Sequence, residues 1–300
     1  MTIQIGPFEL REPLPDLRQP RMLVALQPWV DVGSVGTMAL AFAEEALDAQ
    51  PLGQLSRPGA FYDFTRYRPV LRRRGGQREV TVPNTFLHSA RTPDGPDWLF
   101  LHCLEPHALG EDYVEGLVQV VKRLGVRQYA MIGSMYAAVP HTRPPIASGG
   151  STNPETMEHL RRAGVRESNY EGPTTILAML GSLLPPAGIE TSTIVLQLPA
   201  YAQIERDYRG LHAVLELLNK LYGLPLDLEP VREEMERQVQ AMDETVAEDE
   251  RLAAWLHELE RLYDAEAGSL ANPEPGTDLS PELERFLRDV QQRGFDSETR

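Results

Sequence analysis

The sequence has one cysteine, three tryptophans and no long uninterrupted apolar segment. Cys103 has no second cysteine with which to form a disulfide within the chain, which is typical of proteins in a reducing compartment. The longest apolar runs are short or interrupted, as at Pro185 and Pro186, so no bilayer-spanning segment is expected. Residues 1–20 lack the basic start and apolar stretch of a signal peptide. These absences predict a cytoplasmic protein outside the membrane.

Basic residues are also scarce, and the formal net charge is −15. Residues 229–300 hold 20 acidic and 8 basic side chains, so −12 of this charge lies in the C-terminal tail. Nucleic-acid binding depends on Lys and Arg side chains that displace counterions from phosphates, so nucleic acid is not an expected partner. The one basic cluster, Arg72-Arg73-Arg74 before Gly75-Gly76, is interpreted as a solvated hairpin turn.

Short apolar runs alternate with amphipathic segments through residues 20–225, which is the pattern of a mostly parallel sheet covered by helices on both faces. The predicted fold class is therefore α/β. The pattern predicts strands at Met22–Leu26, Trp98–Leu101, Tyr129–Ile132 and Thr193–Leu198, a hairpin within Phe61–Val82, and helices at Thr37–Asp48, Glu111–Leu124, Pro154–Ala163, from Gly172-Pro173 to about Leu184, and at Gly210–Tyr222.

The pattern changes after Pro225, which suggests a domain boundary between residues 1–225 and the rest. Apolar residues at helical spacing predict an acidic amphipathic extension over 226–266, formed by two helices or by one helix with a register shift. Residues 267–300 are expected to hold a linker and a short helix at Pro281–Gln292. The apolar stripe of the extension is expected to pack on its own core or on a sister subunit, the alternative being a groove on another protein.

Three segments resemble the PAC2 family in its bacterial form. The first is the strand-to-helix loop from Trp29 to Gly36. The most specific is Gly133-Ser-Met-Tyr-Ala-Ala-Val-Pro140-His141-Thr142-Arg143-Pro144, and the third is Gly172-Pro173-Thr174. The resemblance implies a three-layer α/β/α, phosphorylase/hydrolase-like fold and self-association, a trimer being one expected form. Eukaryotic and archaeal members of the family help to assemble proteasome rings, so it also implies protein partners.

The loop Asp31-Val-Gly33-Ser34-Val-Gly36 allows two interpretations. Its glycines could bring backbone N–H groups close to an anion at a helix N-terminus, although neither a P-loop nor a complete dinucleotide fingerprint is present. Alternatively, Asp31 or Ser34 caps the following helix, and the glycines permit close strand-to-helix packing.

The segment His141-Thr142-Arg143 lies between Pro140 and Pro144, which restrict its backbone. His141 could serve as a general acid or base, and Arg143 could bind a carboxylate or phosphate, with Thr142 and the glycine loop completing a ligand site. Alternatively, Arg143 pairs with an acidic residue such as Asp31, and His141 makes a structural hydrogen bond. No catalytic residue is assigned with certainty by spacing.

Cys103 lies next to His102 and near His107, but neighbouring strand residues point to opposite faces, so a Cys–His catalytic pair is not expected. The scattered histidines give no metal-ligand spacing, and neither a metal nor a cofactor is predicted.

Two functional hypotheses follow. The first is a non-enzymatic scaffold or assembly chaperone that acts through protein–protein contacts as a homo-oligomer. The alternative is an enzyme or binder of a small anionic ligand at the loops of Asp31–Gly36 and His141–Arg143; whether the chain is an enzyme stays open at this point.

Overall fold

The centre of the sheet consists of the four apolar strands predicted from the sequence, which confirms the α/β fold class. The computed structural model describes residues 1–269. Strand β3 (Arg21–Gln27) lies between β8 (Trp98–Leu104) and β9 (Gln128–Ala137), and β12 (Glu190–Pro199) follows β9, all four in parallel. Their side chains are buried on both faces, which explains the continuous apolar runs.

The outer strands are short and mostly antiparallel, so the prediction of a mostly parallel sheet holds only for the four central strands. The order across the ten-stranded sheet is β1-β2-β4-β7-β8-β3-β9-β12-β10-β11. The outer strands are β1 (Thr2–Ile5), β2 (Phe8–Arg11), β4 (Gln50–Leu55), β7 (Phe86–Ala90), β10 (Ile146–Ser151) and β11 (Val165–Glu167). Short loops join only two of the antiparallel pairs of this sheet, β1–β2 and β7–β8, as in hairpins, whereas the other antiparallel neighbours are separated by further elements of the chain.

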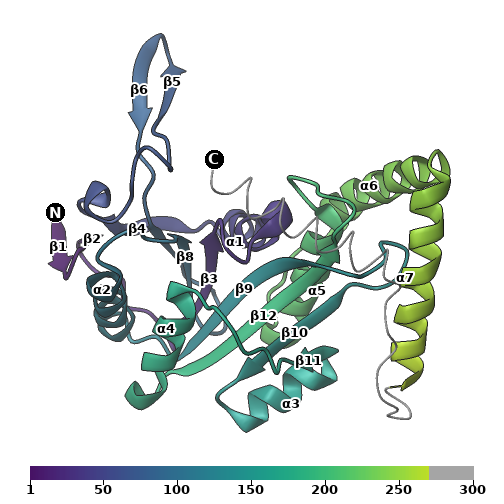
Figure 1. Cartoon of the computed structure of the whole chain (residues 1–300). Coiled ribbons are helices and arrows are strands. Elements are labelled where there is room, and N and C mark those ends of the chain that lie inside the picture. Colours follow the sequence, from purple (N-terminus) through teal and green to yellow (C-terminus); the bar gives the residue numbers. More distant parts are fainter. Residues whose placement is uncertain (270–300) are drawn as a thin grey trace.

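Helices cover both faces of the central strands, and side-chain alternation along β3 divides the core accordingly. Met22, Val24 and Leu26 face the cluster that includes α2 and α4, whereas Leu23 and Ala25 face the cluster that includes α1, α3 and α5. Figure 1 shows these two groups of helices on opposite sides of the sheet. Their bounds are α1 (Val35–Ala46), α2 (Gly110–Arg123), α3 (Pro154–Arg162), α4 (Ile176–Leu183) and α5 (Tyr208–Tyr222).

Helix α4 is shorter than the sequence predicts. Gly172 and Pro173 do not open it; the helix begins at Ile176, where the Thr175 hydroxyl accepts a hydrogen bond from the N–H of Ala178 at 3.3 Å. Thr175 is thus the N-cap, a role that its short polar side chain suits. Within residues 1–269, three single-turn 3₁₀ segments lie at Val32–Ser34, Pro58–Ala60 and Pro185–Ala187.

A hairpin of β5 (Val70–Arg74) and β6 (Gln77–Thr81) forms a separate two-stranded sheet. It projects far from the rest of the protein (Figure 1). Gly75 and Gly76 both have positive φ angles, 56° and 84°, as a two-residue turn that follows the strand twist requires. The hairpin spans fewer residues than the predicted Phe61–Val82 region. Phe61 does not belong to it and instead lies buried in the first core cluster.

The extension after Pro225 forms two helices, α6 (Glu229–Ala247) and α7 (Glu250–Ser269), which run in clearly different directions (Figure 1). Helix α6 packs on α5, and its Val231 belongs to the second core cluster. The predicted linker and the helix at Pro281–Gln292 lie outside the described residues. Among the helices of residues 1–269, none combines the length and the apolar character that a bilayer crossing would need.

Close packing of α1 on the sheet gives a first prediction. A Cβ atom added at Gly36 would lie 2.7 Å from the carbonyl oxygen of Ile132, which is backbone and cannot move aside. We expect Gly36→Ala to lower the free energy of unfolding by about 1–3 kcal/mol, as overpacking does. Urea-induced unfolding followed by circular dichroism measures this change.

Gly181 of α4 is the matched control, because a Cβ there meets its nearest atom only at 4.0 Å. Gly181→Ala is expected to raise the free energy of unfolding by about 0.5–1 kcal/mol through helix propensity. Equal effects of the two substitutions would contradict the packing argument.

Candidate functional site

The glycine loop lies at the carboxyl end of β3, beside β9. Asp31 forms an isolated parallel bridge with Ser134, and the N–H of Ser134 donates to the carbonyl of Val30 at 2.8 Å. The Ser134 hydroxyl donates to the carbonyl of Val32 at 2.6 Å. These contacts hold the loop against the neighbouring strand, so that its position does not depend on a ligand.

The N-terminus of α1 already holds an anion, and that anion is the carboxylate of Asp31. Its Oδ1 accepts from the N–H of Gly36 at 2.7 Å and from the N–H of Thr37 at 3.2 Å, and its Oδ2 accepts from the Thr37 hydroxyl. The N–H of Ser34 donates to the carbonyl of Asp31 at 3.0 Å. The amides that would cradle a phosphate are therefore used within the loop.

The two glycines of this loop serve close packing. Gly33 has a φ of 63°, and a Cβ there would lie 2.8 Å from the Cβ of Asp207, the residue that caps α5. The N–H of Asp207 donates to the carbonyl of Gly33 at 2.9 Å, and the Ser34 hydroxyl donates to the carbonyl of Glu205 at 3.0 Å. The loop thus binds the segment that precedes α5 and leaves no room there for a larger group.

The Asp31 side chain is almost completely buried, with 7% of the residue exposed. Burial raises its pKa from 3.8 to about 6, because a charged carboxylate loses hydration there. The hydrogen bonds from Thr37 and Gly36 act in the opposite direction and limit the shift.

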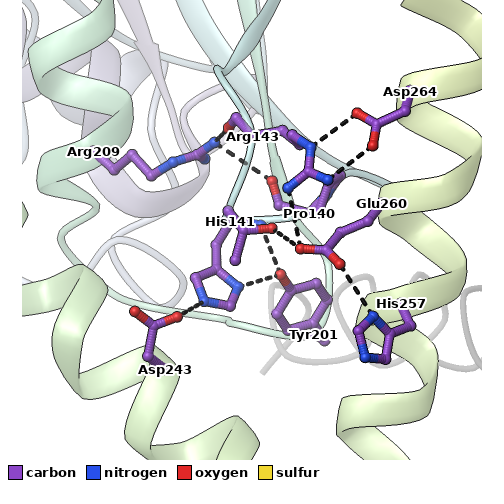
Figure 2. A network of polar contacts seen from close by, with 10 residues as sticks. Pro140, His141, Arg143, Tyr201, Arg209, Asp243, His257, Glu260 and Asp264 are labelled. Carbon is purple, nitrogen blue, oxygen red and sulfur yellow. Dashed lines mark hydrogen bonds and ion pairs between the residues drawn. The ribbon is translucent and has the colours of Figure 1, made fainter.

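The second predicted loop follows β9 and contacts α6 and α7 (Figure 2). His141 is buried: its N–H donates to the Tyr201 hydroxyl at 2.7 Å, and its Nδ1 lies 2.6 Å from the same oxygen. Its Nε2 lies 3.0 Å from Asp243 Oδ1 on α6. These contacts form a row of hydrogen bonds in which the Tyr201 hydroxyl donates to Nδ1 of His141 and the Nε2–H of His141 donates to Asp243.

Arg143 pairs with two acidic residues of α7 rather than with Asp31. Its guanidinium donates to both carboxylate oxygens of Asp264 at 2.8 Å and to Glu260 Oε1 at 3.2 Å. The hydrogen bonds from Arg143 lower the pKa of Asp264, and Arg143 stays charged. Glu260 also accepts from the Thr142 hydroxyl at 2.5 Å, and this bond is the main cause of its lowered pKa.

Two further contacts close the same loop. The Tyr263 hydroxyl of α7 donates to the carbonyl of Pro144 at 3.0 Å. The buried guanidinium of Arg209, at the start of α5, donates to the carbonyl oxygens of Arg143 and Pro140 (Figure 2). Every polar residue of the predicted loop therefore contacts the C-terminal half of the chain.

The polar groups of this loop are engaged by other residues of the chain. Burial raises the pKa of Tyr201 to about 12, which disfavours the phenolate that nucleophilic chemistry would require. Asp264 and Glu260 already occupy one N–H group on each nitrogen of the Arg143 guanidinium, so an external anion would share the guanidinium with them. Asp31 and Arg143 lie on neighbouring strand ends, yet each is engaged by its own set of partners.

The remaining predicted residues lie apart. Cys103 is buried in the first core cluster, where burial raises the pKa of its thiol to about 12. His102 contacts Glu44 at 2.8 Å, and the ring of His107 accepts from the N–H of Asp63 at 3.2 Å. Tyr201, Arg209, Asp243, Glu260 and Asp264 were not identified from the sequence, because nothing in their spacing connects them with residues 141–143.

Comparisons with known proteins agree with this architecture. The sequence model of the PAC2 family matches residues 25–246, a range that extends into α6. No curated protein matches the chain in sequence.

Several solved structures are similar. A Mycobacterium tuberculosis protein of unknown function is 27% identical, with a TM-score of 0.78, 90% of this chain covered and 92% of that chain. A proteasome-assembly chaperone homologue from the same organism is also 27% identical, with a TM-score of 0.69 and coverage of 78% of this chain and 99% of that one. An archaeal proteasome activator from Pyrococcus furiosus, at 15% identity, a TM-score of 0.62 and coverage of 80% and 99%, shares the fold.

The buried carboxylate predicts a pH dependence of stability. Since the pKa of Asp31 is raised to about 6 in the folded protein, the folded state binds this proton more tightly than the unfolded state does. Protonated Asp31 therefore contributes to the free energy of unfolding, and this contribution is fully present below about pH 4. It is lost as the pH rises through about 6, and it amounts to at most about 3 kcal/mol. Urea unfolding at a series of pH values measures this. As the pH rises from about 4 through about 6, the free energy of unfolding of the wild type should fall relative to that of Asp31→Asn.

Glu45→Gln, on the exposed side of α1, is the control and should follow the wild-type pH profile. Parallel profiles for Asp31→Asn and wild type would contradict the raised pKa.

The contact between Arg143 and α7 gives a further prediction. Arg143→Lys keeps the charge but loses the bidentate geometry toward Asp264, so α7 should open more often. Hydrogen exchange followed by mass spectrometry should show faster exchange over 250–269 than in wild type. Arg261→Lys, an exposed residue of the same helix, is the control; equal exchange in the two variants would show that the guanidinium does not hold the helix.

Proposed function

The chain belongs to the PAC2 family, and from this premise we propose that it is an assembly-chaperone-type scaffold that acts through protein–protein contacts as a homo-oligomer. The M. tuberculosis proteasome-assembly chaperone homologue, at 27% identity and with 99% of its chain covered, supports this class of function. The proposed clients are subunits of a ring-forming protease of the proteasome type. The proposed location is the cytoplasm, which suits the single, buried thiol of Cys103.

The projecting hairpin is the observation that carries the proposal. Leu71 and Val80 form a cross-strand pair at its centre, and 58% and 61% of their surfaces are exposed. Val70 and Val82 add apolar surface at 48% and 38% exposure. Exposed valine and leucine in a two-stranded sheet without a covering layer are costly in water, and such a sheet is marginal by itself. A second protein chain that covers it would remove this cost.

Charge on the hairpin also favours a protein partner. Arg72 and Arg73 lie on β5, next to the apolar pair. Arginine beside apolar side chains is common at the centres of protein interfaces, because its guanidinium is weakly hydrated and binds carboxylates with two hydrogen bonds. We propose the hairpin as the surface for self-association, with a trimer as the expected form.

The small-anion alternative has weaker support. Its proposed ligands, Asp31 and Arg143, both form internal hydrogen bonds, and the glycine amides bind the Asp31 carboxylate. A ligand would have to displace groups that the chain itself provides. The scaffold proposal needs no such displacement.

The proposal predicts that the apolar pair supports self-association. Leu71→Thr/Val80→Thr removes apolar surface but keeps residues that favour strands. Sedimentation velocity should give a mass of three chains for wild type and a shift toward one chain for the variant, with at least about a 10-fold weaker association.

Met179→Gln/Leu183→Gln provides the control, since it removes exposed apolar surface from α4, away from the hairpin. This variant should associate more strongly than Leu71→Thr/Val80→Thr. A monomeric wild-type protein at all concentrations would refute the homo-oligomer. Native mass spectrometry with purified proteasome subunits from the same organism then tests the client, and failure to bind them would refute that assignment alone.

A further inference from the structure

Three side chains with metal-binding atoms meet away from both loops. Glu44 lies in the last turn of α1, His88 on β7 and His102 on β8. One oxygen of Glu44, Oε1, lies 2.8 Å from His88 Nδ1 and 2.8 Å from His102 Nε2. The three ligand atoms all lie within 4.8 Å of one another.

The sheet register explains this convergence. Strands β7 and β8 are antiparallel, and His88 pairs with Phe100 whereas His102 pairs with Phe86. The two histidines are therefore diagonal neighbours on the same face, the one that α1 covers. Their rings are 6.0 Å apart between centroids and are inclined by 72°, so that the ring nitrogens can approach a common point from two directions.

The cluster lies on the wall of an open hollow of about 570 Å³. The side chains of Glu44, His88 and His102 are 17%, 25% and 21% exposed, so they are partly dehydrated but can be reached from outside. Gln27 and Phe86 line the hollow near them, and Arg68 and Arg72 lie on the side of the projecting hairpin. An ion and its additional ligand can therefore enter without a change in the fold.

The donor set selects the class of ion. Two imidazole nitrogens and one carboxylate oxygen are a set typical of zinc sites that keep a fourth coordination position for water or substrate. Magnesium and calcium prefer oxygen ligands only. The carboxyl end of a helix carries partial negative charge, and Glu44 lies in that turn of α1, so a cation is favoured there.

We propose that Glu44, His88 and His102 bind a Zn²⁺ ion whose fourth position opens into the hollow beside the β5–β6 hairpin. This assignment replaces the expectation, drawn from histidine spacing alone, that no metal binds. The ion would join α1 to the β7–β8 pair and would present a positive charge at the base of the hairpin.

Metal titration of the full-length chain tests the site. After treatment with a chelator and its removal, calorimetric titration with Zn²⁺ should show one equivalent bound to the wild type. Glu44→Gln and His88→Asn/His102→Asn should weaken binding by at least about 100-fold, because even loss of an outer partner of a metal ligand costs about 10- to 100-fold. Circular dichroism and urea unfolding verify that each variant folds.

Matched controls are Glu45→Gln, the neighbouring exposed acid on α1, and His159→Asn, an exposed histidine on α3. Both should keep wild-type affinity. Co²⁺ added to wild type should give the intense visible absorption of a four- or five-coordinate site, a readout that needs no variant. The proposal is overturned if wild type binds less than one equivalent of Zn²⁺, or if the double histidine variant binds it with wild-type affinity.

Discussion

The binding of the Asp31 carboxylate to the first turn of α1 organises much of the described structure. The carboxylate accepts hydrogen bonds from backbone N–H groups that would otherwise be unpaired at the start of α1, and it does so beyond the carboxyl end of β3, beside Ser134 of β9. Gly33 and Gly36, the two glycines that follow Asp31, let the start of α5 and helix α1 approach closely. Because the beginning of α1 is fixed in this way, its last turn places Glu44 above His88 and His102. Helix α1 is thus capped by Asp31 at its first turn and contributes Glu44, one of the three proposed metal ligands, from its last turn.

Strongly periodic segments were predictable from the sequence, and so was the family. The short apolar run of strand β3 and the helical spacing of α2 both gave elements close to the predicted bounds. The segment from Pro140 to Pro144 was singled out for its three polar side chains, whereas strand β9 runs to Ala137, beyond its predicted end at Ile132. The local sequence of residues 140–144 restricts the backbone through two prolines, which is information that a sequence carries directly.

The partners of that loop could not be predicted, for a physical reason. Arg143 lies 121 residues from Asp264 in sequence, and any of the many acidic residues of the tail would satisfy it equally well on charge alone. The same holds for Glu44 with His88 and His102, whose meeting depends on strand register and on a helix crossing. Strand β10 was missed because Ile146–Ser151 is rich in glycine and serine, and its strand conformation comes from pairing with β12 rather than from local preference.

The docking of α7 on the His141–Pro144 loop also sets a threshold for any competitor. Asp264 and Glu260 are tethered to the loop by the chain itself, so they act at an effective concentration on the order of millimolar, and a free small acid must approach this concentration to compete with them. A single dissolved carboxylate would exchange with them rarely. A partner that first binds elsewhere on the protein holds its own acidic groups near Arg143. These groups then compete with Asp264 and Glu260 at a similar effective concentration. By this comparison of effective concentrations, a tethered acidic group competes for Arg143 better than a free small acid at low concentration does.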